Sequence, residues 1–215
     1  MTQRLLHIID SYYALDEIDV GEFSQFKARG LRFSLKSYKA EGLGHISVLQ
    51  GEGVFGLFKR DVVIITPLKL DLPLYTYDRV HFMGIDKLIV EMYNTIVSDF
   101  CSQEMHRVKR NYSSLKERGS FSPFFESMRL PSSFHKKSWF QRSPSFDKLT
   151  MDHFAAYLSS SDSKQEDTKE KKERTSFFVE GFLENGDPAT SYFIRKYGPK
   201  KTSLLYKKYI FGIEE

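Results

Sequence analysis

Two acidic residues near the middle of the chain, Asp78 and Glu91, have side chains and a spacing that could transfer a proton. They lie in apolar, β-branched segments on either side of Gly84, a pattern that predicts an antiparallel hairpin. A loop of two or four residues centred on Gly84 and Ile85 places Asp78 directly opposite Glu91. Carboxylates that share a dry face repel each other, so the pKa of one rises and it can hold a proton near neutral pH. We therefore expect Asp78 and Glu91 to be catalytic.

A competing interpretation of the same pair stays open. Both carboxylates could lie on a wetted face, or a three-residue loop could break the register. Three other residues of the hairpin, Arg79, His81 and Tyr93, are candidates for contacting a substrate. In a regular strand His81 points to the face opposite Asp78, beside Arg79, so a surface or core histidine is the more frequent alternative.

The hairpin belongs to a longer β-rich region with no helical pattern between its strands. The expected strands are residues 31–38, 45–50, 57–66, 72–82 and 87–96. The expected helices are residues 3–14, 103–118, 150–158 with Thr150 as N-cap, 175–184, a helix from Pro188 to the Gly198-Pro199 pair, and 200–211. Closely spaced strands predict an antiparallel meander, so the fold class is α+β, a central antiparallel sheet flanked by helices.

Two segments lack a clear pattern. Residues 119–147 read as irregular; within them the basic, aromatic stretch 121–146 could stack on nucleic acid, cover a flat carboxylated ligand, or be a loop anchored by aromatic side chains, which is the default. Residues 159–174 are polar and predict a solvated, flexible insertion or the frayed start of a helix. We expect this insertion to interrupt a single domain that spans residues 1–215.

Composition restricts the class of protein. The chain has 215 residues, of which 40% are hydrophobic and 15% aromatic, as in a globular protein with a sizeable core. A single cysteine, Cys101, rules out an internal disulfide, and no signal peptide or membrane span is recognisable, so we expect a cytoplasmic protein. The formal charge of +4 is compatible with acidic proteins, polycarboxylates or nucleic acid and does not choose among them.

No bound cofactor is expected. The stretch from Gly51 to Gly56 matches a dinucleotide-binding glycine pattern, but a strand follows it where that site requires a helix. The six histidines show no metal-ligand spacing on a helix, so we predict no metal site.

The stretch from Asp71 through Leu72-Pro73 to Asp78 resembles the ferredoxin-dependent bilin reductases, in which an Asp-Leu-Pro-Ile-Phe-Gly-x-Asp stretch lies on a central strand. The last Asp of that motif protonates the bilin and corresponds to Asp78. The end of the chain, with Tyr206 and Ile210-Phe211-Gly212, resembles the family's closing helix. Together the two matches cover about three quarters of the chain.

The resemblance to this family, and to the related red chlorophyll catabolite reductase, implies an α/β/α sandwich with a pocket between the sheet and the C-terminal helices. It implies an oxidoreductase that acts on a linear tetrapyrrole, with electrons supplied singly by ferredoxin and no bound flavin or metal. The chain departs from the family at four places: it lacks the His near Val62, a Glu near Gln50, the Gly at Thr76 and the final Asp at Gly212.

Three functions remain as hypotheses. The first is a bilin reductase in which Asp78 donates protons and basic side chains meet the propionates or the acidic ferredoxin. The second is a protein that binds a tetrapyrrole or another flat carboxylated ligand without chemistry. The third is an interaction module that uses the loop 121–146. Nucleic acid and membranes are not expected partners.

Overall fold

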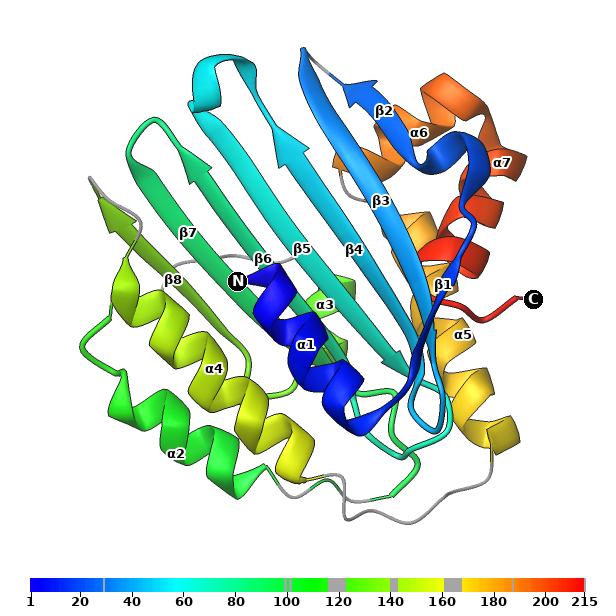
Figure 1. Cartoon of the computed structure of the whole chain (residues 1–215). Coiled ribbons are helices and arrows are strands. Elements are labelled where there is room, and N and C mark those ends of the chain that lie inside the picture. Colours follow the sequence, from blue (N-terminus) through cyan, green and yellow to red (C-terminus); the bar gives the residue numbers. More distant parts are fainter. Residues whose placement is uncertain are drawn as a thin grey trace.

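The centre of the molecule is an antiparallel sheet. The computed structural model describes residues 1–28, 30–98, 100, 102–115, 123–139, 143–160, 168–186 and 188–214. The strands follow the order β1-β3-β4-β5-β6-β7-β8, and β2 pairs with β3 beside β1 (Figure 1). Their bounds are β1 Leu15–Ile18, β2 Gln25–Ala28, β3 Leu31–Ala40, β4 Gly44–Glu52, β5 Phe58–Pro67, β6 Leu74–Phe82, β7 Ile85–Tyr93 and β8 Phe134–Trp139.

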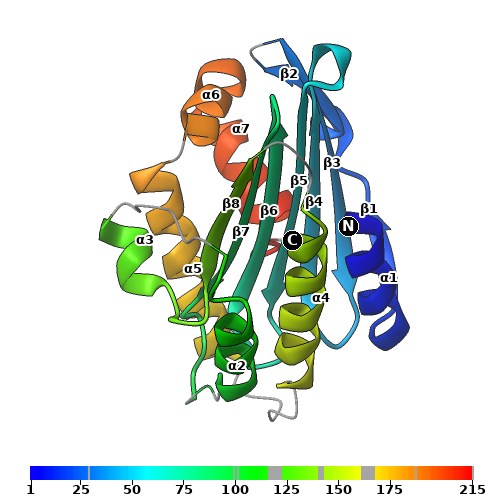
Figure 2. The same ribbon diagram turned by 90° about the vertical axis from the view of Figure 1, so that its left-hand side faces the viewer.

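Helices cover both faces of the sheet. One face carries α1 (Thr2–Tyr12), α2 (Gln103–Asn111) and α4 (Pro144–Ser159). The other carries α3 (Pro123–Met128), α5 (Thr168–Asn185), α6 (Pro188–Tyr197), α7 (Pro199–Leu204) and the π-helical η3 (Leu205–Ile210). The two helical layers lie on opposite sides of the strands in Figure 2. The α/β/α sandwich expected from the sequence is confirmed. Within the described part, no helix is both long and apolar enough to cross a bilayer.

Each face of the sheet has its own hydrophobic core, because side chains alternate along a strand. In β6, Tyr75 and Tyr77 are fully buried and pack with α1 and α4 residues such as Leu5 and Phe154. The second core lies beneath the C-terminal helices and is centred on aromatic side chains of α5, α6 and the end of the chain, including Phe178, Phe193 and Phe211.

The β6–β7 turn corrects the predicted pairing. The turn consists of Met83 and Gly84, whose φ angles of 47° and 77° fit a two-residue hairpin connection. As a result Phe82 pairs with Ile85, Asp78 pairs with Ile89, and Thr76 pairs with Glu91. The prediction that Asp78 lies directly opposite Glu91 is therefore wrong by two residues. A shift of the pairing by two residues keeps both carboxylates on one face of the sheet. They are diagonal neighbours, whose Cα atoms typically lie about 7–8 Å apart.

Two other predictions are corrected in the second half of the chain, and one alternative is decided. Residues 119–147 contain α3 and β8 among the described residues, whereas the sequence suggested irregular structure. Helix α4 begins at Pro144, so Thr150 is not a cap; its hydroxyl donates to the Phe146 carbonyl inside the helix. Helix α5 begins at Thr168, so residues 168–174 agree with the second of the two alternatives given for the 159–174 segment, the start of a helix. Residues 161–167 of the expected flexible insertion lie outside the described residues.

A buried ion pair joins the hairpin to α4. The Arg79 guanidinium donates to both oxygens of Asp86, at 3.0 and 2.7 Å, and also to Asp147. Asp86 in turn accepts from the backbone N–H of Ser143, directly before α4. The side chains of Arg79 and Asp86 are 2% and 0% exposed. Burial disfavours the charged guanidinium, but the hydrogen bonds and charge of Asp86 outweigh it and raise the pKa of Arg79.

Replacing Arg79 with Met is expected to destabilise the fold strongly, because Asp86 would keep a buried charge with no guanidinium. We expect a loss of about 3–5 kcal/mol in the free energy of unfolding, measured by urea denaturation. The matched control is Lys36→Met, which removes an exposed pair with Glu17 and should cost less than about 1 kcal/mol. Equal losses in the two variants would contradict this role of Arg79.

Candidate functional site

An apolar cavity of about 280 Å³ lies between the sheet and the C-terminal helical layer. Its floor is the sheet face that bears Ile64 on β5 and Ile89 on β7. Its roof consists largely of aromatic rings, Phe178 and Phe182 from α5 and Tyr206 from η3. Apolar walls with a few polar groups are typical of small-molecule sites, so this cavity is the candidate functional site.

Asp78 faces the cavity as one member of an ion pair. Arg60 on β5 donates from Nε to Asp78 Oδ1 at 3.1 Å and from Nη2 to Oδ2 at 2.7 Å. The Arg60 and Asp78 side chains are 31% and 16% exposed, and both line the cavity. The geometry therefore supports a carboxylate that accepts hydrogen bonds at this position.

Glu91 faces the same cavity and has two partners of its own. Tyr93 donates its hydroxyl to Glu91 Oε2 at 2.8 Å, and His135 Nε2 lies 3.2 Å from Glu91 Oε1. The Glu91 and His135 side chains are only 13% and 12% exposed. Burial of the Tyr93 phenol and the charge of Glu91 raise the pKa of Tyr93, which keeps its hydroxyl protonated. Glu91 and His135 thus form a shielded carboxylate–imidazole pair.

The structure brings together three of the five side chains selected from the sequence. Asp78, Glu91 and Tyr93 all line the cavity. Arg79 does not, since it lies on the opposite face of the sheet in the buried ion pair with Asp86. His81 shares the face of Arg79, as strand alternation predicted, and does not line this cavity either.

Reasoning from the sequence missed the partners of the two carboxylates, Arg60 for Asp78 and His135 for Glu91. Arg60 could have been found by extending strand alternation from Val62, because residues 60, 62 and 64 share one face of β5. His135 lies on β8, within a segment that its prolines and basic residues make look irregular. The β8 sequence, Phe-His-Lys-Lys-Ser-Trp, has no apolar alternation that would have indicated a strand.

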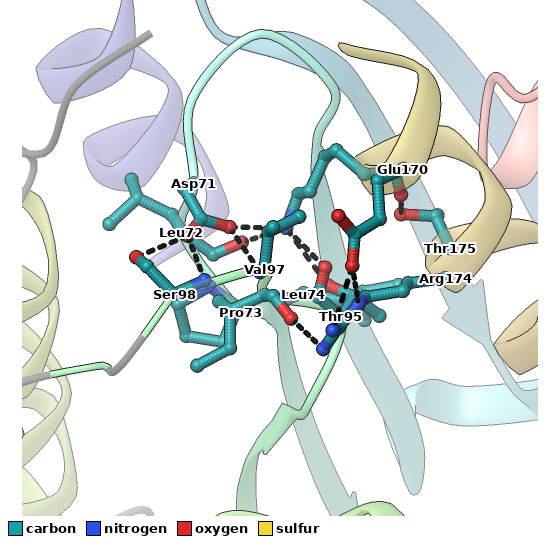
Figure 3. A network of polar contacts seen from close by, with 12 residues as sticks. Asp71, Leu72, Pro73, Leu74, Thr95, Val97, Ser98, Glu170, Arg174 and Thr175 are labelled. Atoms are coloured by element: carbon teal, nitrogen blue, oxygen red, sulfur yellow. Dashed lines mark hydrogen bonds and ion pairs between the residues drawn. The ribbon is translucent and has the colours of Figure 1, made fainter. Parts of the chain in front are cut away.

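The first Asp of the matched motif holds a loop together. Asp71 is buried and accepts hydrogen bonds from the backbone N–H groups of Val97 and Ser98 and from the Ser98 hydroxyl (Figure 3). Burial opposes the charged carboxylate, but these hydrogen bonds outweigh it and lower the pKa of Asp71. Asp71 thus joins the chain before β6 to the chain after β7, and its role is structural.

A buried lysine of α5 completes this network. The Lys171 side chain is 2% exposed; its Nζ donates to the carbonyls of Leu72 and Thr95 and lies 4.0 Å from Asp71 Oδ1. Burial lowers the pKa of Lys171 to about 7, against the opposing charge of Asp71. Helix α5 also carries Phe178, which lines the cavity. The lysine therefore attaches this helix to the segments just before β6 and just after β7.

The end of the chain packs closely around Gly212. Gly212 has a φ of +65°, and a Cβ there would lie 2.3 Å from Cγ of His45. The buried His45 ring hydrogen-bonds to Ser37 Oγ and to the Tyr209 carbonyl, both at 3.0 Å. The end of the chain therefore packs too closely for a side chain at Gly212.

The basic, aromatic stretch 121–146 is largely packed in its described part. Phe124 and Phe125 on α3 contact Phe178 and Phe182 of α5, and Phe125 lines the cavity. Trp139 at the end of β8 is 54% exposed. Residues 121–122 and 140–142 lie outside the described residues. The anchored interpretation of this stretch is the one that the described contacts support.

Comparison with known proteins extends only to the fold. No protein-family model matches the sequence, and no curated protein matches it. Among solved structures, tomato phytochromobilin synthase in complex with biliverdin is similar with a TM-score of 0.74. The match covers 99% of this chain and 83% of that chain at 13% identity. At this identity the likeness shows that the two chains share a fold.

The depressed pKa of Lys171 predicts a pH-dependent stability. The unfolded lysine has a pKa of 10.5 and the folded one about 7, so between these values the unfolded chain binds more protons than the folded chain. The unfolding free energy should therefore rise with pH across this window, by at most about 1.4 kcal/mol per unit. The measurement is urea denaturation of wild type and Lys171→Met from pH 6.5 to 10. The difference between the two should grow in favour of wild type, and a constant difference would contradict the assignment.

Proposed function

We propose that this protein binds a linear tetrapyrrole in the cavity beneath α5 and reduces it with electrons from a ferredoxin. The observation that carries the proposal is the cavity itself. It is lined by aromatic rings, it holds the carboxylates of Asp78 and Glu91, and it occurs in a fold shared with a protein crystallised with biliverdin. A flat conjugated ligand suits aromatic walls, because ring contacts add to the burial of apolar surface.

The polar groups of the cavity match the chemistry of such a ligand. Pyrrole N–H groups are donors, and the carboxylate of Asp78, held by Arg60, is an acceptor that faces the cavity. Arg60 is itself partly exposed and could pair with a propionate of the ligand. The proton-donor role expected for Asp78 remains a prediction, and its pairing with Arg60 favours the acceptor role.

The size of the cavity sets a condition on binding. Its 280 Å³ lies just below the usual range of ligand pockets, about 300–1,000 Å³. A linear tetrapyrrole carries four rings and two propionates, so the aromatic roof must separate from the sheet when it enters. Movement of α3 or α6 would provide room, because Phe125 and Phe193 line the cavity from these helices.

Reduction requires electrons that the described residues do not supply. One-electron transfers from a reduced iron–sulfur ferredoxin, each coupled to protonation of the ligand, would complete a two-electron reduction. The second candidate is a protein that binds the same ligand without reducing it. The ion pair between Arg60 and Asp78 favours this candidate, since it occupies the carboxylate that corresponds to the family's proton donor.

An absorbance titration with biliverdin tests binding. We expect a saturable spectral shift at micromolar ligand in the wild type, followed under anaerobic conditions by bleaching of the long-wavelength band when reduced ferredoxin is supplied. Ile89→Phe places a ring in the cavity and should weaken binding at least tenfold, whereas Ile89→Val should bind within about threefold of wild type.

The two candidates separate in this experiment. Binding with no bleaching supports the non-catalytic holder. The absence of any spectral shift in the folded wild type, or equal binding by Ile89→Phe and Ile89→Val, would rule out the cavity as a tetrapyrrole site.

A further inference from the structure

His135 brings an imidazole into the cavity from β8, the strand next to β7 on the side away from β6. His135 lies on β8 and pairs in register with Ile89, so its side chain shares a sheet face with those of Ile89 and Glu91. His135, Glu91 and Ile89 all line the cavity. The sheet face that forms the cavity floor therefore carries two separate polar groups: Asp78, and the pair formed by Glu91 and His135.

The two groups differ in what holds them. Both oxygens of Asp78 accept hydrogen bonds from the Arg60 guanidinium, a group that can only donate. Glu91 Oε1 instead lies 3.2 Å from His135 Nε2, an imidazole nitrogen that can donate or accept a hydrogen bond. Tyr93 donates to the other oxygen of Glu91 and holds that carboxylate in place.

We propose that Glu91 and His135 form the proton-donating pair of this cavity, with Tyr93 as the positioning residue. The inference rests on the proposed function, and it assigns the acid of that reaction to residues other than Asp78.

The chemistry balances one electron at a time. Reduced ferredoxin gives one electron to the bound tetrapyrrole, which becomes a radical anion. The proton shared by His135 and Glu91 is transferred to that radical, so the bond from proton to donor breaks and a bond to the ligand forms. The pair regains a proton from water, and a second electron and proton complete the reduction. The ferredoxin is oxidised by two electrons in total, and the ligand gains two hydrogen atoms.

The expected effects differ between binding and turnover. General acids contribute about 10²- to 10⁴-fold to rate, so His135→Gln and Glu91→Gln should slow anaerobic reduction of biliverdin at least 100-fold. Their affinity for biliverdin should stay within about threefold of wild type. Because electrons still arrive, the one-electron-reduced ligand should accumulate and be visible by electron paramagnetic resonance. Tyr93→Phe keeps the ring but frees Glu91, and should lower kcat while leaving KM nearly unchanged.

The matched control is His7→Gln, which alters an exposed histidine on α1 on the other face of the sheet. Asp78→Asn is compared in the same assay. If His135→Gln reduces biliverdin at the wild-type rate, this inference is wrong while the proposed function stands. The same holds if Asp78→Asn binds biliverdin but does not reduce it, while His135→Gln still reduces it. If the wild type reduces no biliverdin, the proposed function fails and the inference falls with it.

Discussion

The register of the β6–β7 hairpin is the constraint on which the rest of the structure depends. Met83 and Gly84 both adopt positive φ, so the loop has two residues and each strand presents alternate side chains to opposite helical layers. Asp78 and Glu91 consequently face the cavity, while Arg79 and Asp86 face α4 in a buried ion pair. A one-residue slip of β7 against β6 would turn Glu91 and Asp86 to the opposite faces and break the buried pair of Arg79 with Asp86.

This constraint explains which predictions from sequence were right. Alternation alone placed Asp78 and Glu91 on one face, because parity survives a slip of two residues. The predicted pairing of Asp78 with Glu91 was wrong because it placed the centre of the turn at Gly84 and Ile85. Nothing in the sequence indicates that Met83, a residue with a Cβ, adopts a positive φ and forms the turn with Gly84. The sandwich architecture was predictable from the order of strand and helix patterns, which are local properties of the chain.

Contacts between distant segments were beyond prediction. His135 meets Glu91 only because β8 joins the sheet at β7, and β8 lies in a segment with little apolar periodicity. Lys171 lies in a polar run that predicts a solvated segment, yet its Nζ donates to the carbonyls of Leu72, just before β6, and Thr95, just after β7. The Asp-Leu-Pro-x-x-x-x-Asp pattern therefore separates into two roles here: Asp71 fixes loops together with Lys171, and Asp78 faces the cavity.

Methyl NMR with biliverdin tests the central claim most directly, since neighbouring residues of one strand report on opposite faces of the sheet. The account predicts that biliverdin shifts the methyl signals of Ile64, Ile89 and Leu205, which line the cavity, and leaves those of Val63 and Val90 on the other face nearly unchanged. Shifts concentrated at Val63 and Val90, or no shifts at saturating ligand, would contradict a tetrapyrrole site between the sheet and the C-terminal helices.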